Sequence, residues 1–223
     1  MPTVLVTGAN RGIGLEWVRQ YASEGWRVLA GCRRPDKAEA LKEIEGDVTV
    51  HPVDVARPDH IVDWAQRLKG QPIDILINNA GHGGDDRAAD PAEWTKTNQV
   101  NVIGPFEMAR RFRDNVAASE RKMIVNLSSR MGSIGDNSEG GSYAYRATKA
   151  ALNAAMKSLA IDWKDSGITI VLFHPGWVKT AMGGPDALID VEASVTAMRK
   201  KMDQLSPADS GSFFNYKGET LPW

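Results

Sequence analysis

The feature that most constrains this chain is the alternation of short apolar, β-branched runs with longer segments of helical pattern. Two of the runs, IDILI at 73–77 and ITIVLF at 168–173, are almost continuously apolar. Such runs suit strands that are covered on both faces, as in a parallel sheet. Alternating strands and helices with short links predict a doubly wound α/β sheet with helices on both faces. We therefore expect about seven mostly parallel strands in a single Rossmann-like domain spanning residues 1–223.

The expected elements follow one another along the whole chain. The strands are predicted at 3–7, 26–32, 48–53, 73–78, 123–127, 168–173 and 212–216. Helices are predicted at 15–24, 36–45, 59–68 and 191–202 and in the segment that contains Tyr145. A polar loop is expected at 82–91, followed by a long helical region that runs through residue 118.

Composition excludes several classes of protein. The chain has 223 residues, a net charge of −1 and a pI near 6.4, so no global field draws it to nucleic acid or to a membrane. The single cysteine, Cys32, excludes an intrachain disulfide framework. The first residues lack the pattern of a signal peptide, and no apolar run is long enough to span a membrane. We expect a cytoplasmic protein without a metal site and without nucleic-acid or membrane partners.

Glycines cluster between the first predicted strand and the first predicted helix. The segment TGANRGIG at 7–14 places Gly8, Gly12 and Gly14 in a G-x-x-x-G-x-G spacing. Glycines at such a turn let backbone N–H groups approach a pyrophosphate at the N-terminus of the helix. A tight strand-to-helix turn also uses glycine for packing, so the glycines indicate a dinucleotide site only together with their position in the first strand–helix unit.

The end of the second predicted strand indicates which dinucleotide is bound. A site for NAD usually has an acidic residue there, which accepts a hydrogen bond from the ribose 2′-hydroxyl. This chain has Cys32, Arg33 and Arg34 at that point, and Arg11 lies inside the glycine turn. Arginines pair with a phosphate, bidentately where geometry permits. The arginines favour NADP over NAD.

Polar or small residues also follow the other predicted strands. Asp54 and Val55 end the third strand, where the carboxylate could accept from an adenine amino group or cap the next helix. The NNAG segment at 78–81 ends the fourth strand and should face the glycine turn, because the strand order reverses there. The PGWVKT segment at 175–180 ends the sixth strand and is placed to contact a nicotinamide. We assign no role to His82.

A tyrosine and a lysine stand four residues apart in the segment predicted to be helical after the fifth strand. At that spacing the side chains of Tyr145 and Lys149 lie on the same face of a helix. A nearby ammonium favours the ionised phenol, so we expect a lowered tyrosine pKa and a general acid/base. Ser128 and Ser129 end the fifth strand, and no helix is expected to begin directly after them. A serine hydroxyl there could hydrogen-bond a substrate carbonyl.

Seven motifs follow one another along the chain: TGANRGIG, DV, NNAG, the helix with Asn101, SS, YRATK and PGWVKT. In that order they resemble the short-chain dehydrogenase/reductase family, and they look most like its sniffer/C-factor-like carbonyl reductase branch. The resemblance implies reversible, NADPH-dependent reduction of a ketone or aldehyde, with NADP(H) preferred over NAD(H). The substrate would be a small carbonyl or alcohol. A C-factor-like signalling or sensor protein that binds NADP(H), with turnover secondary, is the alternative.

The resemblance implies a role for each matching residue. Tyr145 matches the catalytic acid/base, and Lys149 matches the lysine that lowers its pKa and holds the nicotinamide ribose. Ser129 matches the residue that polarises the carbonyl, and Asn101 matches the asparagine that holds a water in a proton relay. The cofactor-binding positions implied are Gly8, Asn10, Arg11, Gly12, Ile13, Gly14, Arg33, Arg34, Asp54, Val55, Asn79, Ala80, Gly81, Tyr145, Lys149, Pro175, Gly176, Val178 and Thr180.

Two features depart from the family pattern. Ser129 and Tyr145 are sixteen positions apart, a few more than in many members, so Ser133 and Ser138 compete as the polarising hydroxyl. The segment after Thr180 is short, which implies an open pocket without a large lid. Candidates for lining that pocket are Trp177, Met182 and the loop at 82–94. The resemblance leaves the assembly open, with a homodimer as one candidate.

Overall fold

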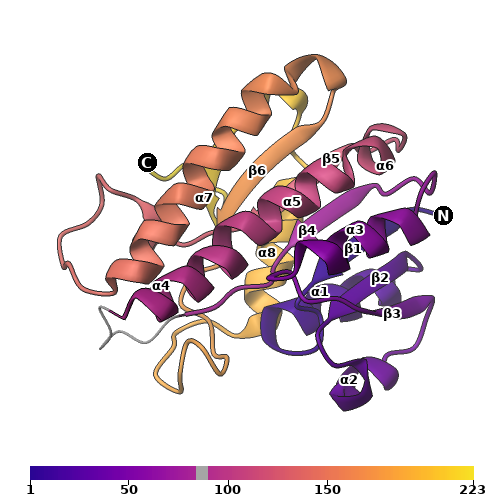
Figure 1. The fold of residues 1–223 in the computed structure, drawn as a ribbon, viewed down its shortest axis with the longest axis horizontal. Coiled ribbons are helices and arrows are strands. Elements are labelled where there is room, and N and C mark those ends of the chain that lie inside the picture. Colours follow the sequence, from indigo (N-terminus) through magenta and orange to yellow (C-terminus); the bar gives the residue numbers. More distant parts are fainter. Residues whose placement is uncertain (84–89) are drawn as a thin grey trace.

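The computed structural model describes residues 1–83 and 90–223 and contains one sheet (Figure 1). Seven strands lie in the order β3-β2-β1-β4-β5-β6-β7. Their bounds are Thr3–Thr7, Arg27–Cys32, Val48–Pro52, Ile75–Asn78, Met123–Leu127, Thr169–His174 and Ser212–Asn215 for β1 to β7. Every neighbouring pair of strands is parallel. The predicted doubly wound sheet is confirmed.

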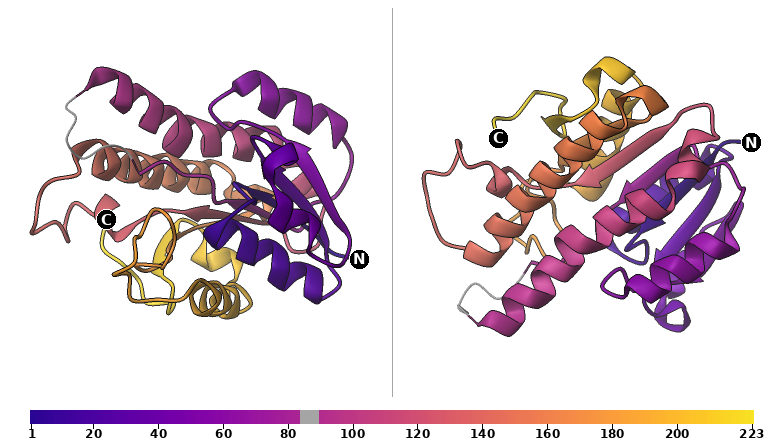
Figure 2. Two further views of the ribbon diagram at one scale, coloured as in Figure 1. Left: turned by 90° about the horizontal axis from the view of Figure 1, so that it is seen from below. Right: turned by 45° about the horizontal axis from the view of Figure 1, so that its top comes forward.

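Helices cover both faces of the sheet (Figure 2). One face packs against α1 (Gly12–Ser23) and α8 (Val191–Met202). The other face packs against α3 (Pro58–Arg67), α5 (Gly104–Arg111), α6 (Arg113–Ala117) and α7 (Tyr143–Asp162). Within the described residues, no helix is both long enough and apolar enough to span a membrane.

The two apolar layers are each built around a fully buried tryptophan. Trp17 of α1 lies in the layer beneath α1 and α8, and Trp64 of α3 lies in the opposite layer. Gly31 of β2 makes room for the second of these rings, because a Cβ at that position would lie 2.6 Å from the Trp64 side chain. A glycine inside this strand therefore serves close packing between the strand and α3.

The helix predicted at 36–45 is much shorter in the structure. A 3-10 turn at Pro35–Lys37 is followed by α2, which covers only Glu39–Lys42. The buried Ala38 separates them with φ −106° and ψ 52°, which lie outside the helical range. The backbone at this one alanine therefore interrupts the helix that local pattern predicts.

The long helical region predicted through residue 118 is divided. It comprises α4 (Pro91–Asn98), a π-helical turn at Gln99–Ile103, and then α5 and α6, which meet at Phe112. A π-helical turn inside a helix is rare and often marks a functional site. The loop predicted at 82–91 falls partly on residues 84–89, which lie outside the described residues.

The topology gathers several strand ends at one edge of the sheet. β1 lies between β2 and β4, so the order of the strands reverses at that point. In open α/β sheets, ligands bind beyond the carboxyl ends of the strands at such a reversal. The glycine turn and the NNAG, SS and PGWVKT segments lie at or directly after the carboxyl ends of β1, β4, β5 and β6, and so lie along this edge.

Candidate active site

The glycine turn after β1 packs directly against the loop after β4. The Asn79 side-chain amide donates to the carbonyl oxygens of Thr7 and Gly8, at 2.9 and 3.2 Å. A Cβ at Gly8 would lie 2.9 Å from the Cα of Ala80, and one at Gly14 would lie 2.1 Å from the Gly8 oxygen. The two segments that we expected to face each other are in contact, and the turn leaves no room for side chains there.

A pocket of ≈ 460 Å³ lies at this edge of the sheet. Most of the predicted cofactor residues line it: Gly8, Asn10, Arg11, Gly12, Ile13, Gly14, Arg33, Asp54, Val55, Asn79, Ala80, Gly81, Tyr145, Lys149, Pro175 and Thr180. Three predicted residues lie elsewhere. Arg34 is exposed, Val178 is buried, and Gly176 lines a second pocket of ≈ 210 Å³.

The apolar residues expected to line the pocket divide between the two cavities. Met182 lines the larger pocket, whereas Trp177 lines the smaller one and donates from its indole N–H to the Gly183 oxygen at 2.7 Å. Of the loop expected at 82–94, residues 84–89 lie outside the described residues. His82 on one side of that gap lines the larger pocket.

Charged side chains line the part of the pocket near β2 and β3. Arg11 and Arg33 are exposed, and the carboxylate of Asp54 lies with them in the lining. Asp54 Oδ1 accepts from the backbone N–H of Ala56 at 3.0 Å. Because α3 begins at Pro58 and Arg57 is its N-cap, the alternative in which Asp54 caps this helix is wrong.

Ser129 lies beside Tyr145, and its hydroxyl acts to lower the pKa of the phenol. Ser129 follows β5 and is 7% exposed, and its Oγ accepts from the backbone N–H of Met131 at 3.2 Å. This contact caps a 3-10 turn at Arg130–Gly132, so the expectation that no helical turn begins after this serine is wrong. A hydroxyl both donates and accepts, so the cap leaves the Ser129 proton available.

The neighbouring serines have other partners. Ser128 Oγ donates to Asn153 Oδ1 at 2.6 Å, and Ser133 Oγ donates to the Trp223 carbonyl oxygen at 3.2 Å. Ser138 is exposed. Of the serines that the sequence left in competition, Ser129 is the one that the structure brings to Tyr145.

Lys149 lies almost completely buried one helical turn beyond Tyr145. Its Nζ donates to the Leu127 carbonyl oxygen at 2.7 Å and lies 5.7 Å from the centroid of the Tyr145 ring. Burial lowers the pKa of Lys149 to about 8, because the charged ammonium loses its hydration. Near neutral pH this side chain is therefore close to changing its charge.

Burial also raises the pKa of the Tyr145 phenol, and the neighbouring Ser129 hydroxyl opposes this only in part. The direction is opposite to the one that we expected from the lysine alone. The spacing in the sequence indicated the neighbouring ammonium, whereas the loss of hydration on burial disfavours the phenolate and is the largest effect on this pKa. In the protein alone, Tyr145 is therefore a protonated phenol at neutral pH.

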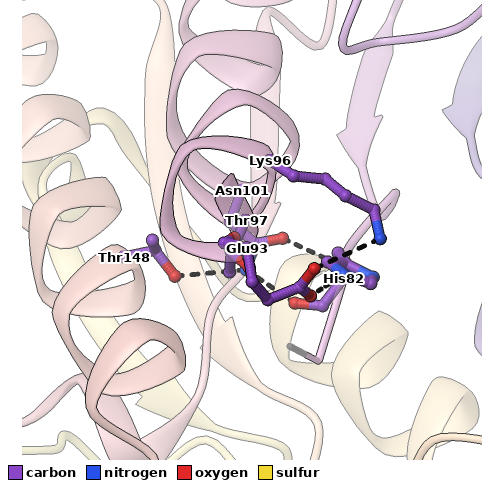
Figure 3. Close-up of polar contacts among 6 residues, drawn as sticks. All are labelled: His82, Glu93, Lys96, Thr97, Asn101 and Thr148. Atoms are coloured by element: carbon purple, nitrogen blue, oxygen red, sulfur yellow. Dashed lines mark hydrogen bonds and ion pairs between the residues drawn. The ribbon is translucent and has the colours of Figure 1, made fainter. Parts of the chain in front are cut away.

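Asn101 lies in the π-helical turn and ties the loop after β4 to α7 (Figure 3). Its Oδ1 accepts from the backbone N–H of His82 at 2.8 Å, and its Nδ2 donates to the His82 carbonyl oxygen at 2.9 Å. The same Nδ2 lies 3.2 Å from Thr148 Oγ1, which donates to the Tyr145 carbonyl oxygen at 2.9 Å. Both polar atoms of the Asn101 side chain therefore hydrogen-bond to neighbouring residues, His82 and Thr148.

His82 is a site residue to which we assigned no role from the sequence. Its Nε2 donates to Glu93 Oε1 at 2.5 Å, and Lys96 Nζ lies 3.4 Å from Glu93 Oε2 (Figure 3). The hydrogen bond from His82 holds the pKa of Glu93 below its ordinary value. His82 and Glu93 are eleven positions apart with no periodic relation, so no local sequence pattern indicates their contact.

Known proteins are similar to this chain in sequence and in fold. The family model for short chain dehydrogenases matches residues 2–187. C-signal of Myxococcus xanthus is 42% identical over 155 residues, which cover 68% of this chain and 93% of that protein. The carbonyl reductase Sniffer of D. melanogaster is 32% identical, with a TM-score of 0.92 and complete coverage of both chains.

An NADPH-bound carbonyl reductase from chicken fatty liver is 33% identical with a TM-score of 0.89. The match covers 100% of this chain and 99% of that chain. The family model covers most of this chain, and these structures match its fold over its whole length. The chain belongs to the short-chain dehydrogenase family.

Proposed function

We propose that the protein reversibly reduces a ketone or aldehyde carbonyl to an alcohol with NADPH. The observation that carries this proposal is the meeting of Ser129, Tyr145 and Lys149 beside the pocket that the glycine turn also lines. A carbonyl oxygen placed against the two hydroxyls would receive two hydrogen bonds. Such donors stabilise the negative charge that develops on that oxygen.

The lining of the pocket fits a phosphorylated dinucleotide. Gly8, Gly12 and Gly14 line the pocket at the start of α1, where backbone N–H groups can bind a pyrophosphate. Among the described lining residues, Asp54 is the acidic side chain, whereas the basic ones are Arg11, Arg33, Lys96, Lys149 and Lys179. When bound, NADPH would supply the hydride to the carbonyl carbon. The residues of this chain supply position, charge and protons.

The pKa directions suit proton donation by Tyr145. A phenol whose pKa is raised by burial stays protonated, as a general acid that protonates an alkoxide must be. Lys149, with a pKa of about 8, can take up a proton near neutral pH and return it toward the phenol. We assign Asn101 the role of ordering the path between this lysine and solvent, because its side chain holds the adjoining backbone.

Replacement of the proposed acid tests the reaction. Tyr145→Phe removes the hydroxyl and keeps the ring, so we expect reduction of aromatic aldehydes by NADPH to fall at least ~1000-fold. NADPH affinity should change less than threefold, as measured by tryptophan fluorescence. Turnover close to that of the wild type in this variant would exclude Tyr145 as the acid.

We further propose that NADP(H) is preferred over NAD(H). Arg33 and Arg11 are exposed on the pocket beside Asp54, in reach of a phosphate on the adenosine ribose. We expect Arg33→Ala to weaken NADPH binding at least ~10-fold and to leave NADH binding within twofold. Equal affinity of the wild type for both cofactors would contradict the preference.

A signalling protein that binds NADP(H) is the second candidate function, and the similarity to C-signal favours it. The two candidate functions differ in whether the biological activity requires turnover of a substrate. A signalling activity that survives Tyr145→Phe would support the second candidate, and its loss together with turnover would support the first. The cytoplasmic location, the homodimer and the single-domain organisation stay predictions.

A further inference from the structure

The loop after β4 is held at two points by one continuous helical segment. Asn101 of the π-helical turn binds both backbone groups of His82, at 2.8 and 2.9 Å. Glu93 of α4, on the same helical segment, binds the imidazole of His82 at 2.5 Å. Figure 3 shows the carboxylate of Glu93 reaching the ring from α4 while Asn101 reaches the backbone. We define these three residues as the His82 clamp.

The clamp lies against the catalytic residues. A Cβ at Gly81 would lie 3.7 Å from Asn101 Oδ1 and 3.9 Å from Lys149 Nζ, so the residue before His82 lies next to both of these side chains. Asn101 also contacts Thr148, the residue that precedes Lys149. A shift of His82 would therefore be transmitted both to the backbone next to Lys149 and to Asn101.

The chemistry of the ring contact makes it strong and directional. A carboxylate only accepts, so Nε2 carries the proton in this contact and the tautomer of neutral His82 is defined. Glu93 is only 16% exposed at its side chain and His82 is 31% exposed, so the bond is partly shielded from water. Charge-assisted hydrogen bonds of this kind are stronger than neutral ones.

We propose that Glu93 and His82 are positioning residues for the reduction, acting together to hold Asn101 and the loop 79–82 in register with Lys149. This inference rests on the proposed function for its kinetic readout only. Glu93 and His82 would act through Asn101 and the loop backbone, not by contact with the reacting atoms. Because a displacement of about 1 Å in a catalytic group can cost on the order of 100-fold in rate, loss of the clamp should lower kcat.

The kinetic test compares single, double and conservative variants. We expect Glu93→Ala and His82→Ala each to lower kcat at least ~10-fold, while NADPH affinity stays within threefold. The double variant should be no slower than the slower single variant, because both remove the same contact. Glu93→Gln keeps an acceptor for Nε2–H and should recover most of the loss. Additive losses, or an unchanged kcat in Glu93→Ala, would overturn the proposal.

The matched control is Glu107→Ala on α5. Glu107 is also 16% exposed at its side chain and pairs with Arg110 and Arg111, but it does not line the pocket. It should leave kcat within twofold. A loss as large as that of Glu93→Ala would mean that any surface ion pair of this kind affects turnover, and the assignment to the clamp would be wrong.

A second readout does not depend on turnover. The His82 N–H is protected by Asn101 Oδ1, so amide hydrogen exchange in a peptide covering 79–83 should accelerate in Glu93→Ala and stay unchanged in Glu107→Ala. Unchanged exchange in Glu93→Ala would overturn the clamp. If the wild type reduces no carbonyl compound but exchange responds as expected, the proposed function fails and the clamp stands.

Discussion

His174 provides a test of how burial couples to acid stability in this fold. It ends β6, and its Nδ1 is buried without a hydrogen-bond partner among the described residues. Burial lowers the pKa of His174 from 6.5 to about 4, and the positive charge of Arg130 adds to this effect. The folded protein therefore favours the neutral imidazole, whereas the unfolded chain binds a proton below pH 6.5.

The sign of the effect follows from proton uptake. Between about pH 6.5 and pH 4 the unfolded state binds more protons than the folded state, so stability falls as the pH is lowered. A difference of this size corresponds to about 3 kcal/mol below pH 4 and to about 2 kcal/mol at pH 5. Above pH 7 both states are neutral at this residue, and the contribution vanishes.

We propose to measure this with His174→Phe. The side chain borders the cavity of ≈ 210 Å³, which offers room for the slightly larger ring. Urea unfolding followed by tryptophan fluorescence gives the free energy of unfolding at pH 7.5 and at pH 5. The difference at pH 7.5 reports packing alone. From pH 7.5 to pH 5 the wild type should lose about 2 kcal/mol more than the variant. Losses that agree within about 0.5 kcal/mol would refute the reasoning.

Two further substitutions test the buried amine and the glycine turn. Lys149→Met removes an ammonium whose burial costs about 3 kcal/mol below pH 8, a cost that its hydrogen bond to Leu127 partly offsets. The variant should therefore lose activity. Its free energy of unfolding at pH 7, measured with urea, should nevertheless rise by about 1 kcal/mol. Its stability should also lack the wild-type rise between pH 8 and 10.5; a large loss at pH 7 would contradict this. Gly14→Ala places a Cβ 2.1 Å from a backbone oxygen and should cost on the order of 3 kcal/mol and abolish NADPH binding in a fluorescence titration. Gly135→Ala, whose Cβ would lie 3.4 Å from its nearest neighbour, is the control, and equal behaviour of the two would contradict the steric argument.

The parts of the fold that could be predicted from the sequence are those that local apolar pattern determines. The fifth strand and the last helix have the predicted bounds, 123–127 and 191–202, because apolar residues at the right period begin and end there. The reversal of the strand order follows from the alternation of strands and helices together with the position of the glycine turn. These features depend on neighbours in the sequence.

Several parts of the structure differ from the prediction because local sequence pattern does not indicate which contacts form there. The backbone at Ala38 leaves the helical range and interrupts a helix, and the π-helical turn at 99–103 occurs where the buried Asn101 binds a loop distant in sequence. Ser129 caps an unexpected 3-10 turn through a contact with the backbone N–H two residues later. The contact of Asn101 is tertiary, whereas that of Ser129 is local.

The pKa of Tyr145 also depends on contacts that local sequence pattern does not indicate. Its helical spacing from Lys149 could be predicted, and with it the sign of one electrostatic effect. The larger effect is desolvation, which depends on how completely the surrounding elements cover the ring, and it reverses the direction of the pKa shift in the protein alone. The sequence therefore identifies which groups meet in this site. Their protonation states follow from burial, which favours a protonated Tyr145 beside a Lys149 whose pKa is lowered to about 8.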